Sequence, residues 1–275
     1  METIIRCNWT FPPTLNRKGA SRKPYDLKSV IVVRCDLFDS PTIAMSDIHS
    51  HTAAVTEKLR NFVDLSQCTV ITAGDMAGAM VYGSDADPTE DLLRINSLAK
   101  EFYYVHGNHD SPSPAANKRL RTTRNQAGKL CSLDAGSNKG GIGGVDGTIS
   151  SKDHINKFPK RIYLDKLERV LRSRPSVLVT HETPAITVAG EGFGFDQETG
   201  YLIGNTDVFR VVNSYRPRIH IYGHCHHPDP FYYVNGVQYI NVDGRIIIFV
   251  RDLEMWHAIK GPSAAGPPPA PDAEN

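Results

Sequence analysis

The chain lacks any long apolar run and any strong charge of one sign. It has 275 residues, with 31 lysines and arginines against 30 aspartates and glutamates, so its formal net charge is only +1. A nearly neutral chain gives no overall electrostatic reason to expect binding to nucleic acid or to a membrane surface. The amino terminus carries Glu2 and Arg6 and no long apolar stretch, so it predicts neither a signal peptide nor a membrane span. Secretion is not expected on these grounds.

Cysteine is also scarce, and its spacing argues against a sulfur-based site. The 5 cysteines are widely scattered and include no Cys-x-x-Cys pair. An odd, scattered set is typical of reduced thiols in a cytoplasmic protein rather than of a disulfide framework. We therefore expect a cytoplasmic protein. A chain of this length can bury one large α/β core.

What the sequence does contain is a series of short apolar runs, each followed at once by residues that can bind a hard metal ion. The runs are β-branched or aromatic and have the length of buried strands. They span residues 42–45, 69–73, 102–105, 177–180 and 218–222. The blocks behind them are Asp47 with His49, Gly74 with Asp75, residues 107–110 (Gly-Asn-His-Asp), His181, and residues 223–226 (Gly-His-Cys-His). Each block alone is common, but all of them in this order form a specific signal.

Consecutive strand ends can bring these side chains into one crevice. In open α/β sheets, ligand sites gather outside the carboxyl ends of the strands, where loops carry chemistry on a rigid scaffold. The candidate metal ligands are Asp47, His49, Asp75, Asn108, His181, His224 and His226. Carboxylate, amide and imidazole donors without thiolate favour manganese, iron, zinc or magnesium. So many donors exceed the needs of one tetrahedral ion, whereas two ions sharing a carboxylate would use them all.

This arrangement resembles the calcineurin-like metallophosphoesterases, whose motif blocks run Asp-x-His, Gly-Asp, Gly-Asn-His-Asp/Glu, His and Gly-His-x-His. Every block is present, and the resemblance covers roughly residues 42–251. It implies an α/β fold in which a two-sheet β-sandwich is flanked by helices, with two divalent metal ions. It also implies that one ion is held by Asp47, His49, Asp75 and His226, and that Asp75 bridges to a second ion completed by Asn108, His181 and His224. His109 would be the general acid that faces the leaving group, and Asp110 would orient it.

The rest of the chain predicts a mixed sheet. Helical spacing at residues 55–63 and 92–99, each ahead of a strand, indicates parallel pairing. A C-terminal hairpin turns at Asn235 and Gly236 and is followed by a strand over residues 246–250. We divide the chain into an N-terminal extension (residues 1–41), whose strands at 3–7 and 30–33 pair or join the sheet, a metallophosphoesterase domain (residues 42–252) and a disordered tail (residues 261–275).

Two stretches that leave from metal-bearing strand ends are expected to be loops that shape the substrate pocket. Residues 111–151 contain a basic run from Lys118 to Lys129 and then the glycine-rich residues 140–147, and residues 189–205 are glycine-rich again. The basic run either attracts phosphate or is a solvated surface, and the second reading is favoured about two to one. The glycines lack the Lys-Ser/Thr ending of a P-loop.

These features predict a two-metal-dependent hydrolase of phosphate esters, in which a hydroxide that bridges the ions attacks and His109 protonates the leaving group. Ser/Thr protein phosphatases of the family extend the Gly-Asp block into Asp-Arg-Gly, whereas here Met76 follows Asp75. A small phosphodiester is therefore the favoured substrate, and no membrane partner is expected. A DNA or RNA nuclease of the same family is the first alternative. A non-catalytic scaffold on this fold is the second, although scaffolds typically lose ligands that this chain retains.

Overall fold

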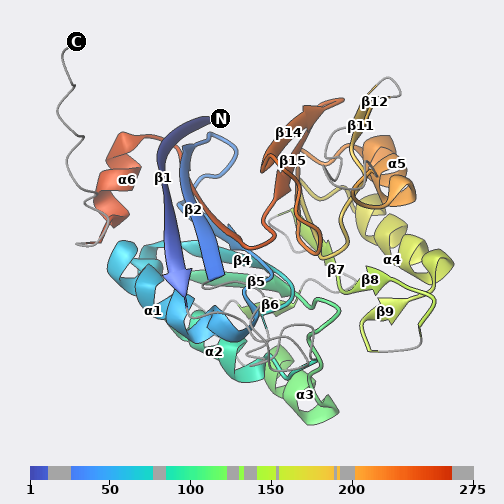
Figure 1. Ribbon diagram of the computed structural model, residues 1–275, viewed down its shortest axis with the longest axis horizontal. Coiled ribbons are helices and arrows are strands. Elements are labelled where there is room, and N and C mark those ends of the chain that lie inside the picture. The colour runs from blue at the N-terminus through green and yellow to red at the C-terminus, as the bar shows by residue number, and fades with distance from the viewer. Residues whose placement is uncertain are drawn as a thin grey trace.

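Two β-sheets pack face to face, and helices cover their outer faces (Figure 1). The computed structural model describes residues 1–11, 26–76, 85–122, 130–132, 141–152, 155–188, 191–192 and 202–261. One sheet is seven-stranded, in the order β1 (Glu2–Phe11), β2 (Asp26–Arg34), β16 (Arg245–Val250), β3 (Thr42–Met45), β4 (Thr69–Ala73), β5 (Glu101–Val105) and β6 (Leu130–Ser132). The other is five-stranded, in the order β14 (Phe231–Val234), β15 (Val237–Asn241), β13 (Ile219–Tyr222), β10 (Val177–Thr180) and β7 (Ile142–Val145). This architecture confirms the predicted fold class.

Each sheet has its own set of helices. The seven-stranded sheet is covered by α1 (Thr52–Phe62), α2 (Thr89–Leu98), α3 (Pro114–Thr122) and α6 (Leu253–Ile259). The five-stranded sheet is covered by α4 (Lys160–Arg172) and α5 (Thr206–Tyr215). The described elements also include two 3-10 turns, His49–His51 and Leu65–Gln67. There are two short strand pairs as well: β8 (Thr148–Ile149) pairs with β9 (Lys157–Phe158), and β11 (Thr187–Val188) pairs with β12 (Glu191–Gly192). Among the described residues, no helix has the length and apolarity needed to cross a membrane.

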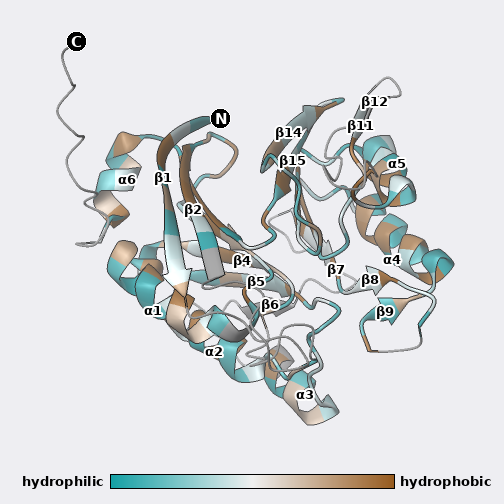
Figure 2. Cartoon of the chain, viewed as in Figure 1, coloured by the Kyte–Doolittle hydropathy of each residue, from teal (hydrophilic) through white to brown (hydrophobic). Residues whose placement is uncertain are grey.

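The strands divide their side chains between two apolar layers, as the two-residue period of a strand requires. In β16, Ile246 and Ile248 pack towards the helices, whereas Ile247 and Phe249 face the second sheet. Ile221 of β13 meets this inner layer from the other side. In Figure 2 the helices carry both teal and brown residues, as expected for elements that bury one side. A rigid double layer therefore lies beneath the strand ends that carry the motif blocks.

The predicted strands at both ends of the chain are present. β1 pairs antiparallel with β2, and β2 joins the sheet parallel to β16. The hairpin of β14 and β15 turns at Asn235 (φ 52°) and Gly236 (φ 87°), the left-handed pair that a two-residue hairpin turn prefers. Both strands of the N-terminal extension therefore belong to the sheet that carries the site.

The expectation of one long loop over residues 111–151 is wrong. This stretch contains α3, β6, β7 and β8, and the basic residues Lys118 and Arg119 lie on α3. Gly143 allows α4 to pack closely against β7, because a β-carbon at this position would lie 2.6 Å from Cγ1 of Val170 on α4. Of the other predicted loop, residues 202–205 lead into α5, whose first amides are capped by Asn205. The remaining part of the basic run, most of residues 189–201 and the tail beyond residue 261 lie outside the described residues.

Candidate metal centre

The motif blocks lie at one edge of the two sheets, because β3, β4 and β5 are mutually parallel and β10 is parallel to β13. Three of the predicted ligands form a buried cluster there. The ligand atoms of Asp47, His49 and Asp75 all lie within 4.8 Å of one another, with Nε2 of His49 4.0 Å from Oδ2 of Asp75. Burial lowers the pKa of His49 to about 4, so its imidazole is neutral, which is the form that binds a metal. These three side chains could hold one cation.

A second cluster shares Asp75 with the first. Nε2 of His181 lies 3.0 Å from Oδ1 of Asn108 and 3.3 Å from Oδ2 of Asp75. The other ring nitrogen, Nδ1, donates to the carbonyl oxygen of Ala73 at 2.7 Å, and a carbonyl can only accept. In the neutral ring, which is the form that binds a metal, Nε2 therefore carries the lone pair and faces two oxygens that also offer lone pairs. A cation between these atoms would be coordinated by all of them.

The remaining predicted ligands differ in their placement. The amide of His224 donates to Oδ2 of Asp47 at 3.0 Å, and the ring of His224 lies against that of His181, with 5.2 Å between the centroids. His226 is 61% exposed, and its ring is turned to other partners. Its Nδ1 is 3.3 Å from Oδ2 of Asp243, and its Nε2 is 2.9 Å from Nη2 of Arg245. Among the described residues, the recorded partners of the His226 ring are therefore Asp243 and Arg245, and metal binding through Nε2 would replace the contact with Arg245.

Several of these residues have the left-handed backbone conformation that side chains other than glycine seldom adopt. The φ angles are 55° at Asp47, 50° at His49, 53° at Asp75 and 70° at His224. Such conformations cost about 1–3 kcal/mol each and concentrate at functional sites, where the surrounding structure holds them. Four of the 8 described non-glycine residues with positive φ are thus predicted ligands.

The charge of the cluster also favours a cation. Burial and the neighbouring carboxylates of Asp243 and Asp75 raise the pKa of Asp47 well above its usual value. Burial alone would raise the pKa of Asp75, but the nearby imidazole of His181 outweighs it and the pKa falls below its usual value. Burial opposes protonation of His181, yet the charges of Asp75 and Asp47 raise its pKa to about 10. The metal-free centre therefore keeps a proton on His181, at a position where a divalent ion would supply the positive charge instead.

The predicted acid His109 lies beside the first cluster, with its ring centroid 5.8 Å from that of His49. Its partner is not the one expected. Asp110 is buried, and its Oδ2 accepts the backbone amides of Asp75 and Gly107, each at 2.8 Å. Nδ1 of His109 instead lies 3.1 Å from Oδ1 of Asp85. The structure therefore places Asp85 at Nδ1 of His109, whereas Asp110 holds together the loops that carry Asp75 and Asn108.

Sequence reasoning missed Asp85 because no strand-like run precedes it. It is placed by pairing of its neighbour, since Ala86 donates to the carbonyl of His109 at 2.9 Å and accepts from the amide of Ser111 at 2.7 Å. Lys28 was missed too, because it lies on a strand that precedes every motif block. Its side chain is buried, and its Nζ donates to the carbonyl of Asp47 at 3.3 Å.

Comparison with known proteins agrees with this geometry. A model of the calcineurin-like phosphoesterase family matches residues 40–228, more than half of the chain. The chain belongs to this family. The calcineurin-like phosphoesterase match begins after β2, so the strand that carries Lys28 lies outside it.

Solved structures share the fold. The protein TT1561 of Thermus thermophilus is similar with a TM-score of 0.51 and 12% identity, over 74% of this chain and 89% of that chain. Another crystal structure has a TM-score of 0.52 and 16% identity, over 74% of this chain and 90% of that chain. Phosphopantetheinyl hydrolase from Mycobacterium tuberculosis gives a TM-score of 0.42 and 14% identity, over 85% of this chain and 98% of that chain. At these identities the first two likenesses show the fold alone. No curated protein sequence matched the chain.

Proposed function

We propose that this protein hydrolyses phosphate esters with the help of two divalent metal ions, and that its preferred substrates are small phosphodiesters. The observation that carries the proposal is the pair of donor clusters that share Asp75. One ion would be held by Asp47, His49 and Asp75, and the other by Asp75, Asn108 and His181, with the His224 ring beside this second set. Bound there, such ions lower the pKa of water and neutralise charge on phosphoryl oxygens.

The protein's own contribution to bond cleavage is a positioned proton. The Asp85 carboxylate, which accepts from Nδ1 of His109, leaves the Nε2 side of the ring to donate a proton to a leaving alkoxide. His109 is 23% exposed, so substrate can reach it, whereas the metal-binding residues around Asp75 are buried. Acid catalysis of this kind typically contributes about 10²–10⁴-fold.

The preference for small diesters rests on charge and on what surrounds the site. In the described part of the chain, the basic residue Arg119 of α3 is paired with Glu90, which offsets its charge towards a polyanion. The sequence places Met76 rather than a phosphate-binding arginine after Asp75. A formal net charge of +1 does not concentrate nucleic acid at the surface.

Metal analysis and hydrolysis of bis-p-nitrophenyl phosphate with added manganese test the proposal. The wild-type protein is expected to hold two ions, and Asp75→Asn to lose metal from both positions, with affinity falling by more than the ~10–100-fold typical of an outer-shell change. Asp165→Asn, which changes an exposed carboxylate on α4, is the matched control and should keep both the metal and the activity. Two ions retained in Asp75→Asn would contradict the shared-carboxylate assignment.

A substrate panel separates the remaining alternatives. Cyclic nucleotides, phosphomonoesters, nucleoside polyphosphates and DNA are offered with manganese, and the cyclic diesters should be cleaved fastest. Cleavage of DNA that falls steeply as salt rises would establish the nuclease instead, because that slope reports counterion release. A wild-type protein that holds no metal and leaves every ester intact would be a scaffold.

A further inference from the structure

A second concave site lies at the opposite edge of the sheets from the metal centre. It is a hollow of about 640 Å³, within the size range of small-molecule sites. Three arginines line it: Arg34 ends β2, Arg251 directly follows β16, and Arg218 directly precedes β13. β16 runs antiparallel to β3, so Arg251, just after β16, lies near the amino end of β3. Arg34 lies beside it, because Arg34 pairs with Val250 at the end of β16. The metal ligands follow the carboxyl ends of β3 and β13, so the three arginines lie at the opposite ends of these strands. The full length of the strands separates the two sites.

The arginines are not equally engaged. Arg34 is paired with Glu2 at 3.3 Å, and Arg251 with Asp252 at 3.1 Å. For Arg218, the structure records no side-chain hydrogen bond or ion pair with any described residue. Asp36 also lines the hollow, so its lining combines guanidinium groups from the ends of strands of both sheets with the carboxylates of Glu2 and Asp36. Guanidinium forks match the geometry of phosphate oxygens, and Arg218 is free to bind them.

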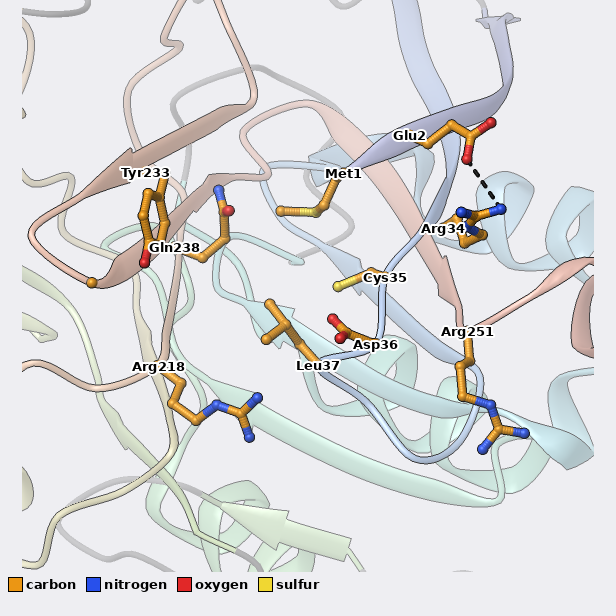
Figure 3. Close-up of a pocket in the computed structure, with 11 residues that line it drawn as sticks. Met1, Glu2, Arg34, Cys35, Asp36, Leu37, Arg218, Tyr233, Gln238 and Arg251 are labelled. Carbon is orange, nitrogen blue, oxygen red and sulfur yellow. Dashed lines mark ion pairs between the residues drawn. The ribbon is translucent and has the colours of Figure 1, made fainter.

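The hairpin of β14 and β15 adds an aromatic and an amide side chain to the lining of the hollow. Tyr233 and Gln238 are cross-strand partners on the hairpin of β14 and β15, so they project from the same face. Tyr233 is 73% exposed, which is unusual for a residue with a large aromatic side chain. Gln238 donates its amide nitrogen to the carbonyl of Tyr232 at 2.9 Å, which leaves the amide oxygen as an acceptor towards the hollow. Figure 3 shows Tyr233, Gln238 and, below these two, Arg218 on one side, with Arg34 and Arg251 on the other.

We propose that this hollow binds a nucleoside phosphate as a second, non-catalytic ligand. The phosphate lies against Arg218, whose backbone carbonyl accepts the amide of Gln238 at 2.9 Å, and the base stacks on Tyr233 with Gln238 at its polar edge. Stacking on an exposed tyrosine tolerates any base, so the site selects for the combination of a planar ring and an anion. Because the site shares no residue with the metal centre, its occupant is not the substrate of that centre.

Calorimetric titration of the full chain tests this directly, with adenosine 5′-monophosphate and inorganic pyrophosphate as probes and with chelator present to keep the metal centre empty. Any affinity tag is placed at the carboxyl end, because Met1 and Glu2 line the hollow. We expect saturable binding of one adenosine 5′-monophosphate with Kd below about 1 mM. Arg218→Ala should weaken binding at least about tenfold, the loss expected for one charge-assisted hydrogen bond. Tyr233→Ala should weaken adenosine 5′-monophosphate about tenfold and leave pyrophosphate unchanged.

Two controls locate the binding. Arg161→Ala removes an arginine that is 93% exposed on α4 and should bind both probes as the wild type does. Asp75→Asn should also bind them normally, which separates this proposal from the function of the metal centre. No saturation by adenosine 5′-monophosphate, wild-type affinity in Arg218→Ala, or loss of binding in Asp75→Asn would overturn the proposal. Equal affinity of both probes together with an unaffected Tyr233→Ala would overturn the nucleoside assignment.

Discussion

Gly107→Ala adds one methyl group at the closest approach between the two loops that meet at the shared ligand. The new β-carbon would lie 2.0 Å from Oδ1 of Asp75 and 2.4 Å from its backbone nitrogen, whereas ordinary contact begins at 3.4 Å. The carboxylate or the Gly107 backbone must therefore move by about 1.4 Å, the difference between these distances. A displacement of about 1 Å at a catalytic centre costs about 10²-fold in rate. We expect a loss of at least this size in kcat, together with weaker binding of both ions.

The same substitution should also lower stability, because overpacking costs about 1–3 kcal/mol. A control must separate that loss from damage to the site. Gly236→Ala provides it, since Gly236 has φ +87° and nothing within 4 Å of its added β-carbon. Alanine in a left-handed conformation costs about 1–2 kcal/mol without any steric contact. Urea denaturation of the metal-free proteins, metal analysis, and hydrolysis of bis-p-nitrophenyl phosphate are measured on both variants.

The two variants should then be similarly destabilised while only Gly107→Ala loses metal and turnover. Wild-type metal content and kcat in Gly107→Ala, at a measured loss of stability, would refute the reasoning, because Asp75 would then tolerate the displacement. Loss of metal in Gly236→Ala would refute it as well, since general destabilisation would explain both results.

Two further predictions concern residues around the centre. His109→Ala should keep both ions, and its rate of hydrolysis should fall about 10²–10⁴-fold on alkyl esters but little on p-nitrophenyl esters, whose leaving groups need no proton. Asp85→Asn should show the same pattern with a smaller loss of rate. Equal losses on both ester types would assign His109 to substrate binding. Lys28→Met should lower the free energy of unfolding of the metal-free protein by about 1–3 kcal/mol, because the buried carbonyl of Asp47 loses the hydrogen bond from Lys28. Lys152→Met, which changes an exposed lysine, is the control. Equal denaturation midpoints for the two variants would contradict a structural role for Lys28.

The strands and the order of the motif blocks were predictable because their signals are local. β-Branched runs such as residues 42–45 and 69–73 match β3 and β4 at both ends. The helix over Lys160–Arg172 was not predicted, although its buried positions Tyr163, Leu167, Val170 and Leu171 have helical spacing. The glycine-rich residues 140–147 that precede this helix predicted a loop instead. Their role at Gly143 depends on a helix that packs from another part of the chain, and nothing in the local sequence shows that.

Within the site, the sequence predicts which residue types gather but not how their rings are turned. His226 satisfies the Gly-His-x-His spacing, yet Arg245 and Asp243, which lie beyond the motif, hold its ring nitrogens. The exchange of Asp110 for Asp85 beside His109 has the same origin. Both depend on contacts between segments far apart in the sequence, whereas a motif describes only the spacing within one segment.

In the first block, left-handed turns and not an extended strand place the side chains of Asp47 and His49 together. In an extended strand, residues two apart would share a face, but the chain has already left β3 at Asp47, and both Asp47 and His49 have positive φ. Each turn is held by a hydrogen bond to the loop after β4, since Asp47 donates to the carbonyl of Gly74 and His49 donates to the carbonyl of Asp75, both at 3.1 Å. These two hydrogen bonds tie the loop after β3 to the loop after β4. Because Asp75 lies in the same pair of loops, the strain that orients the first cluster also fixes the carboxylate that the second cluster shares.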